Sequence, residues 1–428
     1  MLQYLKTKAF ALTAGVAVTL AAGAMFIASG AQAQDKEPIK IGFSMALTGP
    51  LAPNGKQALL GAKIWEEEVN KKGGLIGRPV KLIYYDDQSN PSTVPGIYTK
   101  LLDVDKVDLV VGPYATAMIA PAMPVVIAKN KVFIGLFGLA VNSKFNYPKY
   151  FSMLPTGPDT KPSFTDGFFE VAVKQNPKPQ TLALAWSDLE FSKNACEGAR
   201  DNAKKFGMKI VYDKSYPGNT TDFTPIVRAL QAANADAVII CSYPLDSVGM
   251  VLAVNELGYK PKMIGGAMVG LQATVFKSKL GPALNGIINY ETWVPSQATP
   301  ATNEFLKIYQ AKAGAEGVDP LGYYLGTWGY AYLEMLGNAI TATKSINDDK
   351  IADYLRSNPS KTIMGDITFG KGAKGEWNKA RMLQVQYHGI KKGAGLETWK
   401  GMDYQTVLTP GDLKTGNVIY PYEKALAQ

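Results

Sequence analysis

An apolar run, Val107-Asp-Leu-Val-Val-Gly-Pro113, is followed directly by Tyr114-Ala-Thr116. A short run rich in β-branched residues and bounded by glycine and proline is typical of a strand buried in a parallel sheet. We expect a helix over roughly 117–130, so Thr116 should lie where the strand ends and the helix begins. Open α/β sheets bind ligands at such strand ends, where loop amides and helix N-termini face the bound group. Hydroxyl and apolar groups at this place indicate a molecule that is held rather than transformed.

The same pattern continues on both sides of this run. Ala58, Ala62, Trp65 and Val69 recur at helical spacing, and Gly73-Gly74 ends that helix. A second helix is expected near 97–102, and further strands at 39–47, 80–85 and 132–137. Strands that alternate with helices predict a parallel sheet covered by helices on both faces.

The alternation restarts after the Pro/Gly-rich segment Leu154-Pro-Thr-Gly-Pro158. Strands are expected at 181–186, 208–212, 237–241 and 263–266, with helices near 191–206, 222–233 and 246–257. Beyond 287–293 the chain becomes helical at 303–313, 323–340 and 350–356, and it ends in a β-like tail with a strand at 382–387. Late helices added to an earlier α/β half imply that the chain crosses back between two lobes.

We therefore expect an α/β protein with two lobes joined by three crossings, near 155–160, 287–293 and 363–369. A chain of this length exceeds the usual limit for one hydrophobic core, which also favours two domains. The first lobe is expected to comprise 37–155 and 290–365, and the second 158–286 and 368–428.

The first 33 residues have the form of a signal peptide. Lys6 and Lys8 make a basic start, residues 9–29 are apolar and uncharged, and Ala31-Gln-Ala33 has the small-x-small form of a signal-peptidase site. Cleavage after Ala33 is expected; the alternative is an uncleaved membrane anchor. No cysteine lies near the cleavage point, so a lipoprotein is disfavoured. The mature protein should be soluble and outside the cytoplasm.

Charge and histidine content exclude several functional classes. The formal charge of +9 falls to +7 when Lys6 and Lys8 are removed, and basic residues are scattered without an aromatic–basic motif, which argues against a nucleic-acid partner. The single histidine, His388, excludes histidine triads and most zinc sites, so neither a metal nor another cofactor is expected.

The two cysteines, Cys196 and Cys241, leave two interpretations open. In an oxidising compartment they can form a disulfide, whereas buried thiols would pack as small apolar side chains. Linear spacing does not show whether their Cα atoms approach to the ~6 Å that a disulfide requires.

Enzyme motifs are absent from the sequence. It contains no G-x-S-x-G elbow, P-loop, H-E-x-x-H or clean G-x-G-x-x-G at a strand–helix junction. Asp86 and Asp87 resemble a catalytic carboxylate pair, but they follow a strand and precede Asn90-Pro91, where loop capping and turn formation are the simpler roles. We therefore expect no catalytic residues and no enzymatic activity.

Five segments occur in the order typical of one known family. They are Ile39-Lys-Ile-Gly-Phe-Ser-Met-Ala-Leu-Thr-Gly-Pro50, Asp86-Asp-Gln-Ser-Asn-Pro91, Lys106-Val-Asp-Leu-Val-Val-Gly-Pro113, Thr221-Asp-Phe-Thr224 leading into Ala235-Asp-Ala-Val238, and Tyr323-Tyr324. In this respect the chain resembles the leucine/isoleucine/valine-binding protein family, the type I periplasmic binding proteins of branched-chain amino-acid-type ABC transporters.

The resemblance implies two Rossmann-like lobes with a ligand enclosed between them by hinge closure. It also implies a periplasmic location and delivery of the ligand to a cognate membrane permease. We expect the protein to act as a monomer. A ligand-sensing partner of a membrane receptor would use the same fold and remains an alternative.

The family's ligand positions fall on residues that differ here in an informative way. Thr116 occupies the place of a serine or threonine that grips the ligand carboxylate. In the loop Gly138-Leu-Ala-Val141, amino-acid binders end in a threonine that supports the ligand ammonium, a role that Val141 cannot fill. The amides of Leu139 and Val141 can still donate to an anion.

Two further positions come from the second lobe. Phe191 falls on an aromatic position that is commonly tyrosine, and Tyr243 on another aromatic position. Where amino-acid binders often have an acidic residue that neutralises the ammonium, this chain has Ala267-Met-Val269. The resemblance thus implies a ligand-binding set of Asn54, Tyr114, Thr116, Leu139, Ala140, Val141, Phe191, Tyr243, Ala267 and Met268.

These departures predict the chemistry of the ligand. Burying an ammonium without a partner costs several kcal/mol, so a cationic group is disfavoured. We expect a carboxylate without an amine, with an aromatic acid such as a benzoate or phenylpropenoate first. A branched-chain amino acid or an amide bound by the same fold is the alternative.

Each site residue also has a purely structural interpretation. Thr116 fits a helix N-cap, Phe191 and Met268 fit the core, Tyr243 fits a surface aromatic before Pro244, and Asn54 fits a turn beside Gly55. Trp293 and Tyr324, near an expected crossing, fit either the cleft wall or ordinary packing.

Overall fold

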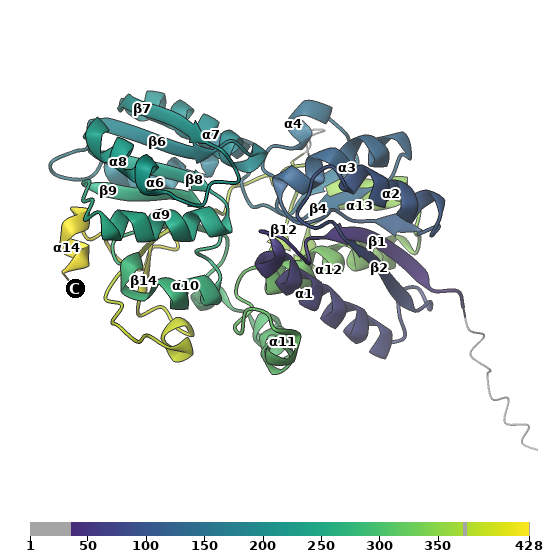
Figure 1. Cartoon of the computed structure of the whole chain (residues 1–428). Helices are drawn as coiled ribbons and strands as arrows, with labels where there is room; N and C mark the ends of the chain where they lie inside the picture. Colours follow the sequence, from purple (N-terminus) through teal and green to yellow (C-terminus); the bar gives the residue numbers. More distant parts are fainter. Residues whose placement is uncertain (1–35, 371–374, 428) are drawn as a thin grey trace, which may run out of the picture. The chain divides into compact units, whose positions relative to one another are not determined.

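The computed structural model describes residues 36–370 and 375–427 (Figure 1). The signal peptide expected at 1–33 lies outside these residues. Within the described ranges, no helix is both long and apolar enough to cross a membrane.

The first lobe is built on parallel strands. β1 (Ile39–Met45) lies between β2 (Val80–Asp86) and β3 (Leu109–Val110). β4 (Phe133–Gly135) pairs in parallel with β5 (Tyr150–Ser152). A parallel bridge between Tyr114 and Leu136 links the segment after β3 to the segment after β4. The strand ends that bear Tyr114 and Phe137 therefore meet at one edge.

Six helices accompany these strands. They are α1 (Ala52–Lys71), α2 (Val94–Asp103), α3 (Thr116–Ala128), α11 (Pro300–Glu316), α12 (Leu325–Thr343) and α13 (Asp348–Ser357). α12 packs closely on α1 although the two helices are far apart in sequence (Figure 1). A Cβ atom at Gly61 would lie 2.2 Å from the carbonyl oxygen of Gly326, so only glycine permits this approach. The late helices return to the first lobe.

The second lobe contains one seven-stranded sheet in the order β14-β13-β10-β9-β8-β6-β7. Its strands are β6 (Thr181–Ser187), β7 (Lys209–Tyr216), β8 (Ala237–Ser242), β9 (Met263–Met268), β10 (Ile288–Glu291), β13 (Leu383–Tyr387) and β14 (Gln405–Thr409). The strands from β6 to β10 are parallel, and β13 and β14 add an antiparallel edge.

Helices α7 (Glu190–Phe206), α8 (Thr224–Ala233), α9 (Pro244–Glu256) and α10 (Thr274–Leu280) accompany this sheet (Figure 1). The shorter elements are α4 (Asn142–Phe145), α5 (Thr160–Ser163), α6 (Asp166–Ala172), β11 (Ser360–Thr362), β12 (Gly365–Ile367), α14 (Tyr422–Leu426) and the 3-10 turns Gly281–Leu284, Pro295–Gln297 and Leu396–Trp399.

Hydrogen bonds place two segments differently from the expected lobe limits. β10 pairs with β9 and β13 in the second sheet. The carbonyl of Gly375 accepts from the amide of Ser152 at 2.8 Å, and Trp377 Nε1 donates to the Ser152 carbonyl at 2.9 Å, beside β5 of the first lobe. We therefore propose that the first lobe comprises 37–155, 292–370 and 375–378, and the second 158–291 and 382–427, instead of limits at 286 and 365.

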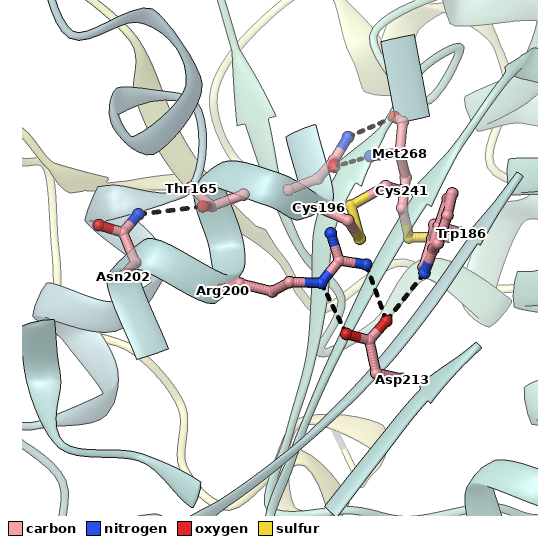
Figure 2. Close-up of a disulfide and its surroundings, with 9 residues drawn as sticks. Thr165, Trp186, Cys196, Arg200, Asn202, Asp213, Cys241 and Met268 are labelled. Atoms are coloured by element: carbon pink, nitrogen blue, oxygen red, sulfur yellow. Dashed lines mark hydrogen bonds and ion pairs between the residues drawn. A yellow bond between two sulfur atoms is a disulfide. The ribbon is translucent and has the colours of Figure 1, made fainter. Parts of the chain in front are cut away.

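Cys196 and Cys241 form a disulfide between α7 and β8, with Cα atoms 6.2 Å apart (Figure 2). Arg200, one turn further along α7, forms a two-point ion pair with Asp213 of β7 at 2.6 and 2.9 Å (Figure 2). Trp186 of β6 donates to the same carboxylate at 2.9 Å. α7 is thus fixed to three strands of the sheet, and its first turn carries Phe191.

Candidate functional site

A small cavity lies between the two lobes. Eleven residues line it: Tyr114, Ala115, Thr116, Phe137, Leu154, Phe164, Phe191, Tyr243, Val269, Tyr290 and Tyr324. All have uncharged side chains, and all are buried. The lining combines apolar walls with five hydroxyl groups.

The cavity lies where parallel strands end. Thr116 lies six residues beyond β3, and Phe137 lies two residues beyond β4. Tyr243 and Val269 directly follow β8 and β9, and Tyr290 lies within β10. This is the position at which open α/β sheets bind ligands, because the loops and helix N-termini of several βα units converge there.

Four helices begin at the cavity. Thr116 and Phe191 lie in the first turns of α3 and α7, while Tyr243 and Tyr324 immediately precede α9 and α12. The first amides of a helix have no intrahelical acceptor, and they carry a partial positive charge. The four helix starts therefore favour an anion in a site without a cationic side chain.

Thr116 lines the cavity with a hydroxyl group whose oxygen already accepts a hydrogen bond. Ala115, at φ +80°, precedes α3 as its N-cap, so Thr116 is the first helical residue and not the cap itself. The Thr116 Oγ1 accepts from the Leu139 amide at 3.0 Å. Since the oxygen is already an acceptor, its own proton is available to a ligand oxygen.

Four phenols surround the same space. Asn54 Nδ2 donates to the Tyr114 hydroxyl at 2.8 Å, the Phe191 amide donates to the Tyr243 hydroxyl at 3.4 Å, and the hydroxyls of Tyr290 and Tyr324 are 3.1 Å apart.

Burial keeps these four phenols protonated. Loss of solvation is the main cause: it raises the pKa of Tyr114 to about 12 and raises the pKa values of Tyr243, Tyr290 and Tyr324 above the usual phenol range. At neutral pH the four side chains are uncharged hydrogen-bond donors.

Aromatic rings form the walls between these donors. Phe164 packs against Phe191 at 5.2 Å and against Tyr290 at 4.4 Å between ring centroids. Phe191 contacts Tyr243 edge-on at 5.7 Å. In the first lobe, the rings of Phe137 and Tyr324 pack with their centroids 5.6 Å apart. Such surfaces suit a flat apolar group.

Of the residues expected from the sequence, Tyr114, Thr116, Phe191 and Tyr243 line the cavity together. Asn54 lies behind Tyr114, which it contacts through the hydrogen bond given above.

The remaining expected residues lie outside the lining set, namely Leu139, Ala140, Val141, Ala267 and Met268. The Leu139 amide was expected to donate to the anion, but it already donates to the Thr116 hydroxyl. Ala267 and Met268 are fully buried within β9, and Met268 exchanges backbone hydrogen bonds with the side chain of Asn289.

Seven lining residues were not in the expected set: Ala115, Phe137, Leu154, Phe164, Val269, Tyr290 and Tyr324. Val269 could have been found by extending the expected strand at 263–266 to the end of β9. Phe164 and Tyr290 lie close to the crossings between the lobes. Hydrophobic periodicity predicts strands and helices, but it does not indicate which residues at a crossing face a ligand.

Contacts between the lobes adjoin the cavity. Asn194 of α7 donates its side-chain amide to the Leu139 carbonyl of the first lobe at 3.0 Å. Lys144 of α4 pairs with Glu190 at the start of α7 at 2.6 Å. The cavity is thus bordered by hydrogen-bonded contacts as well as by its own lining.

The paired aspartates serve the loops of the first lobe. Asp86 accepts from the amides of Leu47, Thr48 and Gln88, and Asp87 accepts from the Ser44 hydroxyl and the Ser89 amide. Neither residue lines the cavity. Among the residues that the structure describes, no cluster of His, Cys, Asp and Glu could hold a metal ion.

Comparison with known proteins identifies the family that shares this architecture. The sequence model of the periplasmic binding protein family matches residues 38–394. A Leu/Ile/Val-binding protein homolog 8 of Brucella abortus is 26% identical over 361 residues, which cover 82% of this chain and 88% of the relative.

Two solved structures share the fold. A leucine-binding protein from Thermotoga maritima has a TM-score of 0.71 at 19% identity, covering 88% of this chain and 100% of that one. A solute-binding protein of an ABC transporter from Rhodopseudomonas palustris, in complex with p-hydroxybenzoic acid, has a TM-score of 0.69 at 19% identity, covering 87% and 98%. With a cavity between two α/β lobes and a family match over most of its length, this chain belongs to the periplasmic binding protein family, in its type I, leucine/isoleucine/valine-binding branch.

Proposed function

We propose that this protein captures a small carboxylate without an amine, with an aromatic acid of the benzoate type as the favoured ligand, and delivers it to a membrane permease of an ABC transporter. Family membership implies a place outside the cytoplasm. Cleavage of the first 33 residues would release the chain into the periplasm, where it would act as a non-catalytic monomer.

The uncharged lining is the observation that carries this proposal. An amino acid would bring its ammonium into a cavity whose eleven lining residues include no carboxylate. Glu291, adjacent to Tyr290 in β10, lies outside the lining set and is paired with Lys277 at 3.2 Å. An unpaired ammonium would therefore lose its hydration without gaining a counterion.

A carboxylate finds donors instead. Thr116 offers a hydroxyl proton, four protonated phenols surround the cavity, and four helix N-termini add partial positive charge. These dipoles can stabilise a carboxylate without a cationic side chain. A negative ligand charge is thus compatible with the site, whereas a positive one is not.

The apolar walls favour an aromatic body for the ligand. Phe137, Phe164 and Phe191 present ring surfaces from both lobes. The same fold holds p-hydroxybenzoic acid in the R. palustris protein, which supports the fit of an aromatic acid to this architecture. A thermal-shift screen of benzoates, phenylpropenoates, their amides and the branched-chain amino acids tests the proposal. Stabilisation by the acids supports it, and stabilisation by leucine alone refutes it.

Removing the Thr116 hydroxyl should weaken acid binding. We expect Thr116→Ala to lower the affinity for benzoate by roughly 1–3 kcal/mol, because a charge-assisted hydrogen bond is lost. Thr116→Ser keeps the hydroxyl and serves as the matched control. Isothermal titration calorimetry measures both variants. Equal losses in the two variants would show that the methyl group, and not the hydroxyl, matters.

Ligand binding should close the lobes, since the cavity takes residues from both of them. We expect a smaller radius of gyration in small-angle scattering when the protein is saturated with an acid that stabilises it. Protein freed of ligand by unfolding and refolding is the control. Identical scattering curves for the two samples would argue against hinge closure.

A further inference from the structure

Asn54 contacts the binding site without lining it. It is the third residue of α1, is fully buried, and donates its side-chain amide to the Tyr114 hydroxyl at 2.8 Å. The next residue, Gly55, lies against the end of β1: a Cβ atom there would be 2.0 Å from the Ala46 carbonyl oxygen. The start of α1 is therefore held in place, and Asn54 with it.

The direction of this hydrogen bond has a chemical consequence. An amide N–H can only donate, so the Tyr114 oxygen is an acceptor and its single proton must point elsewhere. Tyr114 itself lines the cavity, as do Tyr290 and Tyr324, whose hydroxyls lie 3.1 Å apart. Donation from Asn54 to Tyr114 thus leaves the Tyr114 proton for a group in the cavity.

Tyr114 therefore brings to the cavity a hydroxyl whose proton is not taken by Asn54. We infer that Asn54 is a positioning residue that orients the Tyr114 phenol as a donor, so that the site selects a carboxylate over a neutral amide of the same shape. This inference rests on the proposed function and assigns its selectivity to a residue outside the cavity wall.

The other titratable groups near the phenols should not interfere at neutral pH. Tyr114 interacts electrostatically with Tyr243, Tyr290 and Tyr324, and all four remain protonated. Glu291 acts on Tyr290 and Tyr324, and its charge is opposed by Lys277. Glu190 and Asp246 act on Tyr243; burial raises the pKa of Asp246 to about 6, so Asp246 is mostly ionised from pH 7 to 9. The wild-type affinity for benzoate should therefore not change between pH 7 and 9.

The test compares benzoate with benzamide by calorimetry at pH 7.5. In Asn54→Asp, an ionised carboxylate can only accept, so it takes the Tyr114 proton and adds a negative charge. We expect benzoate affinity to fall by at least about 100-fold, since like charges in a desolvated site repel strongly. Benzamide affinity should change by less than about 5-fold, because the amide can donate to the reversed Tyr114 phenol.

The pH profile distinguishes orientation from mere structural support. When the introduced carboxyl is protonated it becomes a donor again. Benzoate affinity of Asn54→Asp should therefore rise more steeply than that of the wild type as the pH falls from 7.5 to 5.5. The smaller change common to both proteins comes from Asp246, which acts on Tyr243 and whose pKa burial raises to about 6. A packing defect would give no such recovery.

Asn54→Leu and Tyr114→Phe keep the test decisive if Asn54→Asp does not fold. If Asn54 acts through Tyr114, Asn54→Leu should lower the ratio of benzoate affinity to benzamide affinity when Tyr114 is present. The same substitution should leave this ratio unchanged in the Tyr114→Phe background. An unchanged ratio in both Asn54 variants, with benzoate still bound by the wild type, would overturn this inference alone. Failure of the wild type to bind benzoate or any other carboxylate would overturn the proposed function together with it.

Discussion

Replacing Val269 by glutamate is expected to abolish benzoate binding. Val269 lines the cavity directly after β9, so a carboxylate there would face the ligand. Like charges placed together in a desolvated interface cost several kcal/mol. Calorimetry of Val269→Glu against the wild type should therefore show no heat of benzoate binding. Leucine titrated into the same variant should bind more tightly than it binds to the wild type.

Val269→Gln is the matched control, because glutamine has the same shape without the charge. We expect this variant to retain most of the benzoate affinity. If the two variants lose benzoate equally, bulk at position 269 and not charge determines the loss. The electrostatic account of the cavity would then be wrong.

Removal of the disulfide is expected to cost about 4 kcal/mol of stability, the value given by loop-closure entropy for a cross-link of this span. Cys196 and Cys241 are separated by 45 positions and fix α7 to β8. Chemical denaturation of Cys196→Ala/Cys241→Ala measures the loss. Because Phe191 begins the same helix, the variant should also bind benzoate more weakly.

A reducing agent provides the control for this second prediction. It should lower the stability of the wild type towards that of the double variant and leave the double variant unchanged. Equal stability of the oxidised wild type and the double variant would contradict the role assigned to the disulfide.

Much of the α/β pattern is predictable from short apolar runs. Ala237–Ser242 is buried at every position, and its flanking charges and proline mark both ends of the strand. Periodicity gives no indication of which sheet a strand joins. β10 was expected at a crossing, yet its pairing with β9 and β13 depends on long-range contacts. The tail containing β14 has many glycines and lysines and shows no alternation that would reveal a strand.

The site was predictable where a residue follows a recognisable strand. Tyr114 and Thr116 could be placed because Val107–Val111 is an unmistakable apolar run. β9, by contrast, runs to Met268, two residues beyond the expected end at 266. This difference moves the cavity position from Ala267 to Val269. A charge at Ala267 would enter the core, where the side chain is fully buried.

The phenols of Tyr290 and Tyr324 show a second limit. They come from a strand of the second lobe and from the start of α12, and only the folded chain brings their hydroxyls to 3.1 Å. The sequence indicated what the cavity lacks, namely a partner for an ammonium. It also indicated Thr116 as a donor and left Tyr324 between the cleft wall and ordinary packing. It did not indicate that Tyr290 and Tyr324 would meet, because their approach depends on how the lobes meet.

Calorimetric titration of the ligand-free wild-type protein with benzoate and with leucine tests the central claim most directly. The uncharged, phenol-lined cavity predicts that benzoate binds more tightly than leucine by several kcal/mol, the cost of an unpaired buried ammonium. Micromolar binding of leucine with no measurable heat from benzoate or related acids would contradict it.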